Sequence, residues 1–338
     1  MSVMGHLNRA VKTLDTVCSK IQLRLGERRG GLITIFVHNL FLDTAEIERN
    51  LACPQQCLTV AQLERAINYF QSVGYRFVSP VEIIAGLAPK GRHVLLTFDD
   101  GYFNNLRALP LMESYAVPAL FFVPARMIQD GTAYWWDELY RTRRGQGCSH
   151  EEAGAEIHPL AMRPTEEVMQ QLAGKLGVRE FRAVTDVDRL FSPQELRAFA
   201  AHPLVFIGNH GCLHEYLPAY PEQEARRAIS EAQQLIHEMT GKPPLAIAYP
   251  VGAYSEQIIQ FAKDAGLRLG FGTDARKEYV PKLGEDNRAM RLGRHTLWGV
   301  GAESIEAQCE YMRSDLGLHC RYRTFMEQLK QRVRRVRT

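Results

Sequence analysis

Two adjacent carboxylates, Asp99 and Asp100, are the first residues of this chain whose types and spacing could carry out chemistry. They follow residues 94–97, which are apolar or β-branched and predict a buried parallel strand. In α/β folds ligands bind beyond the carboxyl ends of the strands, and Gly101 would let the chain turn there so that both carboxylates face one cavity. An isolated Asp-Gly pair is also typical of a solvated turn, so a catalytic function depends on partners elsewhere in the chain.

Two histidines could be these partners. His210 and His214 follow a second predicted strand, residues 204–208, and their spacing of four would place two imidazoles on one face of a helical turn. Two imidazoles and one carboxylate leave a coordination position open for water and substrate, which is typical of a catalytic zinc-type centre. The other aspartate would then be free to act as a general base on that water. Such histidine pairs are also common on ordinary surfaces, but the position after a strand of the same sheet favours the metal site.

The elements that must position these residues alternate between strands and helices, and this alternation indicates a parallel sheet. Capping boxes mark two of the helix starts, Thr59 with Gln62 and Ser192 with Glu195. The predicted strands cover residues 32–37, 94–97, 119–123, 204–208, 245–248, 269–274 and 294–297. We therefore expect an α/β fold, a distorted and incomplete (β/α) barrel with a helical insertion.

Three segments flank or interrupt the barrel, which we place at residues 31–300. Residues 1–30 have helical apolar spacing and predict an amphipathic helix. At about residues 130–190 the alternation breaks, which indicates an insertion that forms a lid or a substrate wall. Its aromatic residues 134–136 could stack on a sugar, although packing onto the barrel is the commoner use. Residues 301–338 predict a basic helical tail that either contacts an anionic membrane surface or is a solvated helix end.

Composition excludes some classes of protein. The net charge of +3 over 338 residues gives no indication of nucleic-acid binding. No stretch of about 18 apolar residues is present, and the first 29 residues contain no apolar core of a signal peptide, so we expect a cytoplasmic protein. Seven scattered cysteines are consistent with reduced thiols there. Cys53 and Cys57 could form a redox or metal pair, but no second pair at zinc-finger spacing accompanies them.

Three motifs in this order resemble the polysaccharide deacetylase family, also known as the NodB-homology or carbohydrate esterase 4 domain. They are Thr97-Phe98-Asp99-Asp100-Gly101-Tyr102, His210-Gly211-Cys212-Leu213-His214 and Tyr249-Pro250-Val251-Gly252. The resemblance covers about residues 30–300. It implies that Asp99 is the catalytic base and that Asp100, His210 and His214 bind one divalent metal ion, with zinc expected. It also implies a substrate groove formed by Tyr102, Tyr249, Pro250, Val251 and Gly252, in which the Val251 N–H stabilises the oxyanion.

The chain departs from the family pattern at two places. Where many members have an arginine that steadies the base, this sequence has Ala248, and Arg294 or Arg291 could replace it, with Asp274 as a further supporting residue. Many members also have a late histidine as general acid, for which His295 would be the candidate. The chain resembles instead the branch of poly-N-acetylglucosamine deacetylases, in which this motif is permuted to the first strand. That resemblance favours His38, at the end of strand 32–37, over His295.

The expected reaction is the metal-dependent removal of an N-acetyl group from an amino sugar, which gives a free amine and acetate. A cytoplasmic member of this family suggests a sugar unit on its lipid or nucleotide carrier, in the assembly of a surface polysaccharide. Two alternatives remain open at this point. One is a deformylase on an N-formyl amino sugar, because the two acyl groups differ by one methyl group. The other is a carbohydrate-binding relative without turnover, which the alanine at position 248 would permit.

Overall fold

The structure is a computed structural model that describes residues 17–19, 21–23, 27, 30–279 and 286–315. Most of the helix predicted for residues 1–30 and residues 316–338 of the predicted basic tail lie outside the described residues. In the part of the chain that is described, no helix is long and apolar enough to cross a bilayer.

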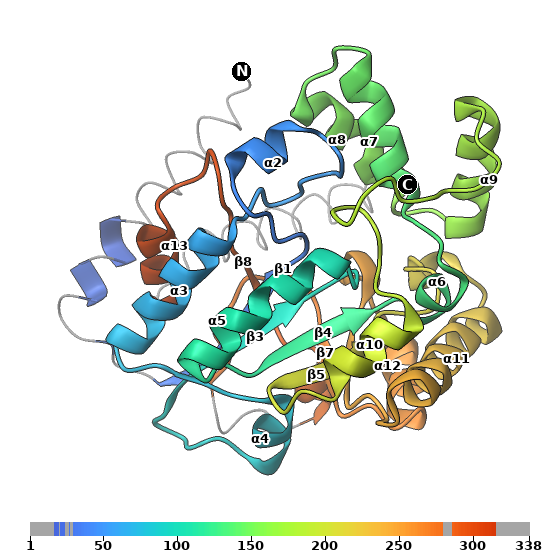
Figure 1. Cartoon of the computed structure of the whole chain (residues 1–338). Coiled ribbons are helices and arrows are strands. Elements are labelled where there is room, and N and C mark those ends of the chain that lie inside the picture. Colours follow the sequence, from blue (N-terminus) through green and yellow to red (C-terminus); the bar gives the residue numbers. More distant parts are fainter. Residues whose placement is uncertain (1–16, 20, 24–26, 28–29, 280–285, 316–338) are drawn as a thin grey trace, which may run out of the picture.

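One parallel sheet forms the centre of the molecule (Figure 1). Over the described residues its strand order is β7-β6-β5-β4-β3-β1-β8, and the short β2 pairs with β3 beside β4. The strands are β1 (Gly31–Val37), β2 (Arg76–Phe77), β3 (Arg92–Phe98), β4 (Ala119–Val123), β5 (Val205–Asn209), β6 (Ala246–Ala248), β7 (Leu269–Phe271) and β8 (His295–Thr296). Each strand predicted from the sequence lies within two or three residues of an observed one.

The sheet curls until its two edges come near each other. Just before β8, the backbone of Leu292 exchanges hydrogen bonds with Gly270 in β7 and with Gly272. β8 itself pairs in parallel with β1, with Ile35 opposite His295 and Phe36 opposite Thr296. The chain from Leu292 to Thr296 therefore links the β7 edge to β1. This arrangement confirms the distorted, incomplete (β/α) barrel.

Helices pack on the outside of the curled sheet (Figure 1). Thr59 caps α3 and Ser192 caps α10, each with the reciprocal capping box that the sequence predicts. In Figure 1, α3 and α13 contact each other on one side, and α10, α11 and α12 cover another. The α-helices are α2 (Thr44–Glu48), α3 (Val60–Ser72), α4 (Pro80–Ala85), α5 (Leu109–Tyr115), α6 (Ala125–Asp130), α7 (Trp135–Gly145), α8 (His150–Leu160), α9 (Thr165–Leu176), α10 (Pro193–Ala200), α11 (Glu222–Thr240), α12 (Glu256–Asp264) and α13 (Ile305–Arg313). The 3-10 helices are η1 (Phe103–Ala108), η2 (Leu217–Ala219), η3 (Pro250–Gly252) and η5 (Asp286–Met290).

Alternation along β1 divides the core in two. Ile33, Ile35 and Val37 belong to the large core cluster that includes the buried side of α3. Leu32 instead belongs to a second cluster with Phe122 and other residues of the neighbouring strands, inside the curl of the sheet. Side chains that point inward near the carboxyl ends of the strands therefore meet at that end of the barrel interior.

The break predicted at residues 130–190 corresponds to helices α7, α8 and α9. In Figure 1, α7 and α8 stand near α2, whereas α9 lies at the right of the picture. The side chains of Tyr134, Trp135 and Trp136 are buried, so they pack rather than offer a free stacking surface. The Tyr134 hydroxyl donates a hydrogen bond to the backbone oxygen of Asp100 at 2.7 Å. The Trp136 indole N–H donates to the Tyr102 hydroxyl at 2.9 Å. The insertion thus supports the turn that follows β3.

Candidate active site

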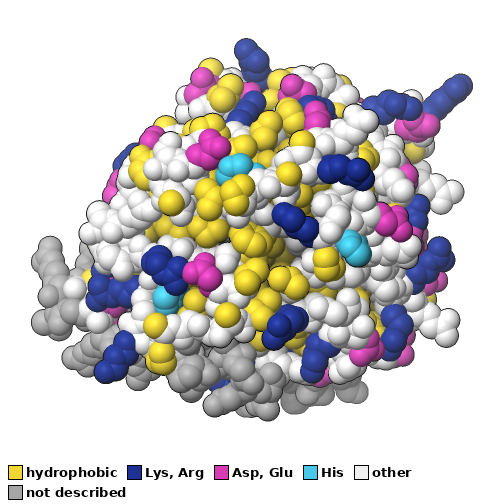
Figure 2. Space-filling model, turned by 60° about the horizontal axis from the view of Figure 1, so that its bottom comes forward, with side chains coloured by type: hydrophobic (Ala, Val, Ile, Leu, Met, Phe, Trp, Pro, Cys, Tyr) yellow, Lys and Arg dark blue, Asp and Glu magenta, His cyan; other side chains and the backbone are white. Residues whose placement is uncertain are grey.

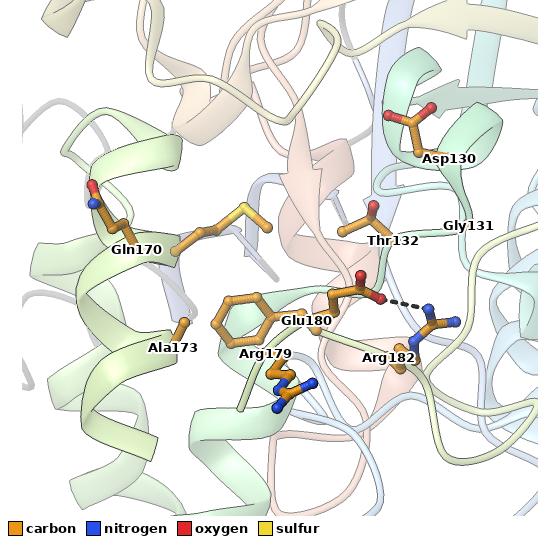
Figure 3. A pocket seen from close by; sticks show the side chains of 10 residues that line it. Asp130, Gly131, Thr132, Gln170, Ala173, Arg179, Glu180 and Arg182 are labelled. Atoms are coloured by element: carbon orange, nitrogen blue, oxygen red, sulfur yellow. Dashed lines mark hydrogen bonds and ion pairs between the residues drawn. The ribbon is translucent and has the colours of Figure 1, made fainter. Parts of the chain in front are cut away.

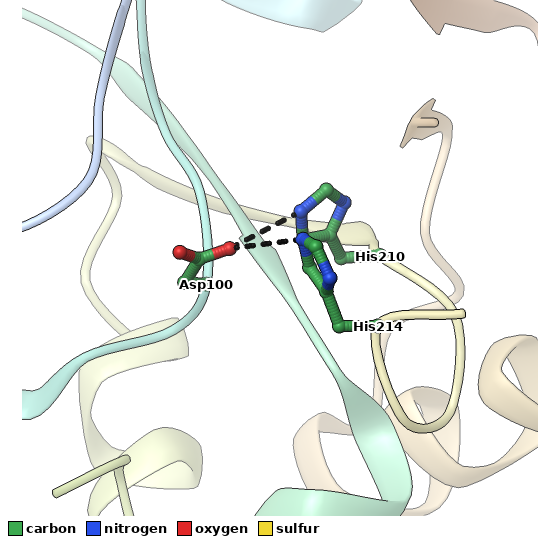
Figure 4. A group of neighbouring side chains, drawn as sticks. All are labelled: Asp100, His210 and His214. Atoms are coloured by element: carbon green, nitrogen blue, oxygen red, sulfur yellow. Dashed lines mark ion pairs between the residues drawn. The ribbon is translucent and has the colours of Figure 1, made fainter. Parts of the chain in front are cut away.

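Three residues from two strand ends form a cluster that could hold a metal ion (Figure 4). Asp100 follows β3, and His210 and His214 follow β5. The Asp100 Oδ1 atom lies 3.4 Å from His210 Nε2 and 3.5 Å from His214 Nε2. Ligand atoms about 2.0–2.1 Å from a tetrahedral zinc ion must lie roughly 3.3 Å apart, so these separations suit one ion.

The two histidines are brought together by an irregular turn, and the helical turn predicted for them is wrong. Gly211 and His214 have φ values of +77° and +57°, which a right-handed helix does not allow. The Asn209 side chain accepts a hydrogen bond from the Gly211 N–H, and the Glu215 carboxylate accepts one from the Cys212 N–H. These side chains satisfy backbone groups that a helix would have paired internally, and the imidazole rings still meet at a centroid distance of 4.8 Å.

The donor atoms fit a cation. The His210 Nδ1–H group donates to the backbone oxygen of Ala248 at 2.7 Å, so His210 Nε2 presents a lone pair toward Asp100. His210 Nε2 and Asp100 Oδ1 are buried and have no hydrogen-bond partner among the described residues. Buried polar atoms are normally satisfied, and a divalent ion between these atoms would satisfy both.

The charges also prepare these groups to bind a metal. Burial alone would raise the pKa of Asp100, but His38, His210 and His214 lower it more, so the carboxylate is ionised. Burial lowers the pKa of His214 to about 4, which leaves its ring neutral at physiological pH. Burial also lowers the pKa of His210, but the neighbouring Asp100 and Asp99 carboxylates outweigh this effect and raise it. A cation would have to displace any proton held by His210.

Asp99, the predicted base, is paired with Arg294. The Arg294 Nη1 and Nη2 atoms each lie 2.7 Å from a carboxylate oxygen of Asp99, and both side chains are buried. The Arg294 Nε–H group donates to the backbone oxygen of Gly272 at 2.9 Å. Burial would raise the pKa of Asp99, but the Arg294 guanidinium, with the nearby histidines, lowers it more, so the carboxylate is ionised. Arg294 therefore contacts Asp99 as the arginine suggested to compensate for Ala248 would.

His38, the candidate general acid, follows β1 and reaches the same cluster. Its Nε2 atom lies 4.0 Å from Asp100 Oδ2. The Gln56 side-chain amide lies 2.5 Å from His38 Nδ1 and accepts a hydrogen bond from the His38 backbone N–H at 3.2 Å. The Asn105 side chain donates to the His38 backbone oxygen at 2.6 Å. These contacts hold the ring with Nε2 toward the cluster of Asp100, His210 and His214.

The structure separates the residues of the predicted substrate groove into two groups. Tyr102 and Tyr249 are fully buried, and their hydroxyls donate to Asp137 and to the Met290 backbone oxygen. Their side chains support the site from within and do not line an open groove, because both fill the core. Val251 and Gly252 are partly exposed, and Val251 has a left-handed φ of +58°. Pro250 is buried beside them.

The remaining candidates lie away from the cluster. The Asp274 side chain is exposed and pairs with Arg276, while its backbone oxygen accepts from the Arg294 N–H. Arg291 pairs with Glu256 at the surface. His295 is buried, and its pKa falls to about 4 because of burial and the nearby Lys277, as is typical of a histidine packed in a protein core. Cys53 and Cys57 are both free thiols.

A cavity of about 510 Å³ lies elsewhere, beside the insertion (Figure 3). It is lined by the end of α6, by α9 and by the following loop, including Gln170, Arg179 and Arg182. Asp100, His210 and His214 do not contribute to its wall. We therefore place the candidate active site at the strand ends and not in this cavity.

Two glutamines of the site were not predicted from the sequence. Gln55 donates to Asp100 Oδ2 at 3.1 Å, and Gln56 holds His38. Both come from the loop between α2 and α3, and Gln55 has a left-handed φ of +47°. A Gln-Gln pair carries no chemical signal of its own, so only the folded loop reveals this function.

The curled parallel sheet is similar to the fold of solved deacetylase structures. The deacetylase PplD of Streptococcus pyogenes, solved with acetate, aligns with a TM-score of 0.56 at 15% identity, over 84% of this chain and 99% of that one. IcaB from Ammonifex degensii aligns with a TM-score of 0.55 at 18% identity, over 84% and 98%. At these identities the likeness shows the fold alone.

Sequence comparison identifies the family. Residues 87–270 match the Polysaccharide deacetylase family, and this chain belongs to it. The protein YxkH of Bacillus subtilis, which bears the same family name, is 23% identical over 218 residues. That match covers 63% of this chain and 57% of YxkH.

Proposed function

We propose that this protein is a metal-dependent hydrolase that removes the N-acetyl group from an amino sugar. The observation that carries the proposal is the buried Asp99–Arg294 pair beside the cluster of Asp100, His210 and His214. Such a site combines an ionised base with a place for a cation. A divalent ion, with zinc expected, would lower the pKa of a water molecule and polarise the acyl carbonyl.

The residues of the chain then divide the proton transfers between them. Asp99 accepts a proton from the attacking water, and Arg294 keeps its carboxylate ionised and oriented. In the doubly protonated form of its ring, His38 delivers the Nε2 proton to the departing amine and returns to the neutral imidazole, whose Nδ1 then accepts from the Gln56 amide. The Val251 N–H is proposed to stabilise the negative charge that develops on the acyl oxygen.

The paired base favours catalysis over a carbohydrate-binding role without turnover. A binding protein has no need of an ionised, buried carboxylate with a dedicated guanidinium, and isolated buried charges are costly. The deformylase alternative uses the same residues, so the acyl group must be identified by its product.

We further propose that the sugar is carried on a lipid or nucleotide and is used in cell-envelope polysaccharide assembly in the cytoplasm. Peripheral contact with an anionic membrane belongs to this proposal, because residues 321–337 combine basic and apolar residues. Figure 2 shows hydrophobic side chains across one face, with Lys, Arg, Asp and Glu side chains around them. Co-sedimentation of the full chain with anionic but not neutral vesicles would support this contact, and equal recovery with both would contradict it.

The experiment that tests the activity is a substrate panel. Purified protein with measured zinc content is incubated with N-acetyl and N-formyl amino sugars, free, nucleotide-linked and lipid-linked, and released acetate and formate are quantified. The proposal expects acetate release that Asp99→Asn abolishes while the metal remains bound. Release of formate alone would establish the deformylase, and binding without either product would establish the non-catalytic relative.

A further inference from the structure

Trp298 is a large aromatic residue that the fold leaves half exposed, at 50% of its accessible surface. The other two tryptophans, Trp135 and Trp136, are buried in the insertion. Single exposed hydrophobic residues are common and need no explanation by themselves. The position of Trp298 near the active site, however, requires an explanation.

Gln56 links the backbone beside Trp298 to His38. Its backbone oxygen accepts from the Gly299 N–H, and its side chain contacts both the backbone N–H and the ring of His38. His38 and Trp298 each follow the carboxyl end of one of two paired parallel strands, β1 and β8. Leu297 is fully buried in the outer core, whereas Trp298, the next residue, is exposed. The exposed indole therefore lies at the end of the barrel at which the active site is built.

The backbone that carries Trp298 is held on both sides. The Gln308 side chain accepts from the Trp298 N–H at 2.9 Å and donates to its backbone oxygen at 2.8 Å. The Gly299 N–H donates to the backbone oxygen of Gln56 at 2.8 Å, in the loop that orients His38. A Cβ atom at Gly299 would lie 2.0 Å from the Cys57 backbone oxygen, so this close approach requires glycine. The backbone that carries the indole is therefore held in a fixed position.

We propose that Trp298 is the stacking surface for the sugar ring that bears the scissile acyl group. The proposal rests on the function proposed above, because His38 must reach the departing amine and the sugar ring must then lie on the His38 side of the metal cluster. An aromatic face there can cover the apolar C–H face of a pyranose while its hydroxyls stay in water. A prepositioned tryptophan loses little side-chain entropy on binding.

Kinetics of Trp298→Ala and Trp298→Phe test this surface. We expect Trp298→Ala to raise KM for an N-acetylated oligosaccharide roughly 10-fold, the scale of one aromatic contact, with kcat within about twofold. Trp298→Phe should restore most of the affinity. Hydrolysis of vinyl acetate, an activated ester without a ring, should be unchanged in both variants. Val81→Ala removes a similarly exposed apolar side chain from α4 at the opposite end of the barrel and is the control.

A binding measurement separates this inference from the proposed activity. In Asp99→Asn, chito-oligosaccharide should protect the exposed tryptophan from acrylamide quenching, and Trp298→Phe should remove the protection. Protection of Trp298 by a protein whose wild type releases no acyl group would overturn the activity and support the stacking surface. Wild-type turnover with an unchanged KM in Trp298→Ala, and no protection, would overturn the stacking surface alone. Neither turnover nor protection would overturn both.

Discussion

Arg294 and Asp99 form a two-point ion pair between residues 195 positions apart in the chain, with both nitrogen–oxygen distances at 2.7 Å. Because β1 lies between β3 and β8, the arginine reaches across the end of one strand to the carboxylate on another. The guanidinium rests within 4.5 Å of the centre of the Phe36 ring, which keeps it on the inner face.

Removal of this guanidinium should damage both stability and turnover. Arg294→Ala would leave Asp99 buried without a counter-charge, a change that typically costs about 3–5 kcal/mol of unfolding free energy. We also expect kcat to fall about 100-fold because the base loses its orientation, while bound metal is retained. Denaturant unfolding, steady-state kinetics and metal analysis measure the three effects. Combining Arg294→Ala with Asp99→Asn should recover part of the stability but none of the activity, and Arg291→Ala, at the surface, should change little.

Metal removal should stop the reaction without unfolding the sheet. Chelator-treated protein is expected to lose activity and to regain it with one equivalent of a divalent ion, because three ligands leave one position for the substrate. His214→Ala should lower the metal content measured by mass spectrometry. Full metal content and full activity in that variant would show that the ligand assignment is wrong.

The choice of leaving group should reveal the general acid. His38→Ala is expected to reduce amide hydrolysis by about 100-fold or more, because an amine must be protonated as it departs. Hydrolysis of an activated ester should be largely preserved, since its leaving group needs no proton. His295→Ala, which changes a buried histidine outside the cluster, should affect both substrates alike and modestly. An exchange of these two behaviours would make His295 the acid.

Gln56→Ala should reduce amide hydrolysis selectively, as His38→Ala does, but by a smaller factor. Its amide fixes the ring through the contact with Nδ1, so Gln56→Ala should slow amide hydrolysis roughly 10- to 100-fold through misplacement of the acid. The activated ester should again be spared, and the change should add little to His38→Ala in a double variant. Fully additive losses would mean that Gln56 acts on something other than the histidine.

Asp137 should make folding stability depend on pH. Burial, with Asp188 nearby, raises the pKa of this carboxyl from 3.8 to about 8 despite hydrogen bonds from Cys53 and Tyr102. Between these two pKa values the folded protein holds a proton that the unfolded chain has released, so stability should fall as pH rises toward 8. We expect a smaller drop in Tm between pH 6 and pH 9 for Asp137→Asn than for wild type. Asp186→Asn, at an exposed site, is the control, and an unchanged drop in Asp137→Asn would exclude this carboxyl as the source.

The strands and helix starts could be predicted from the sequence because their signals are local. The Thr59 capping box and the buried strand 119–123 are specified within a few residues, and both were observed as expected. The motifs also placed Asp100, His210 and His214 together. The partner of Asp99 could be named only as one of two arginines, since the choice depends on which strand closes against β1.

Other features depend on the folded surroundings. Tyr102 was assigned to the substrate groove by its motif, but Asp137 and Trp136 of the insertion enclose its hydroxyl. The turn between His210 and His214 was predicted as helical because spacing alone does not reveal left-handed residues. Its conformation depends on Asn209 and Glu215, whose side chains replace the helical hydrogen bonds.

The strand order has a consequence for how the protein is made. The three residues of the candidate metal site all precede residue 215, whereas Arg294, which neutralises Asp99, directly precedes β8, the last described strand of the sheet. On the ribosome, an emerging chain can assemble β3, β4 and β5 before β8 is available to pair with β1. Until β8 docks, Asp99 lacks the guanidinium of Arg294, which lowers its pKa more than any other neighbouring group, so burial of this carboxylate is less favourable. We therefore expect the pairing of Asp99 with Arg294 and the closure of the barrel wall to occur as one late folding event.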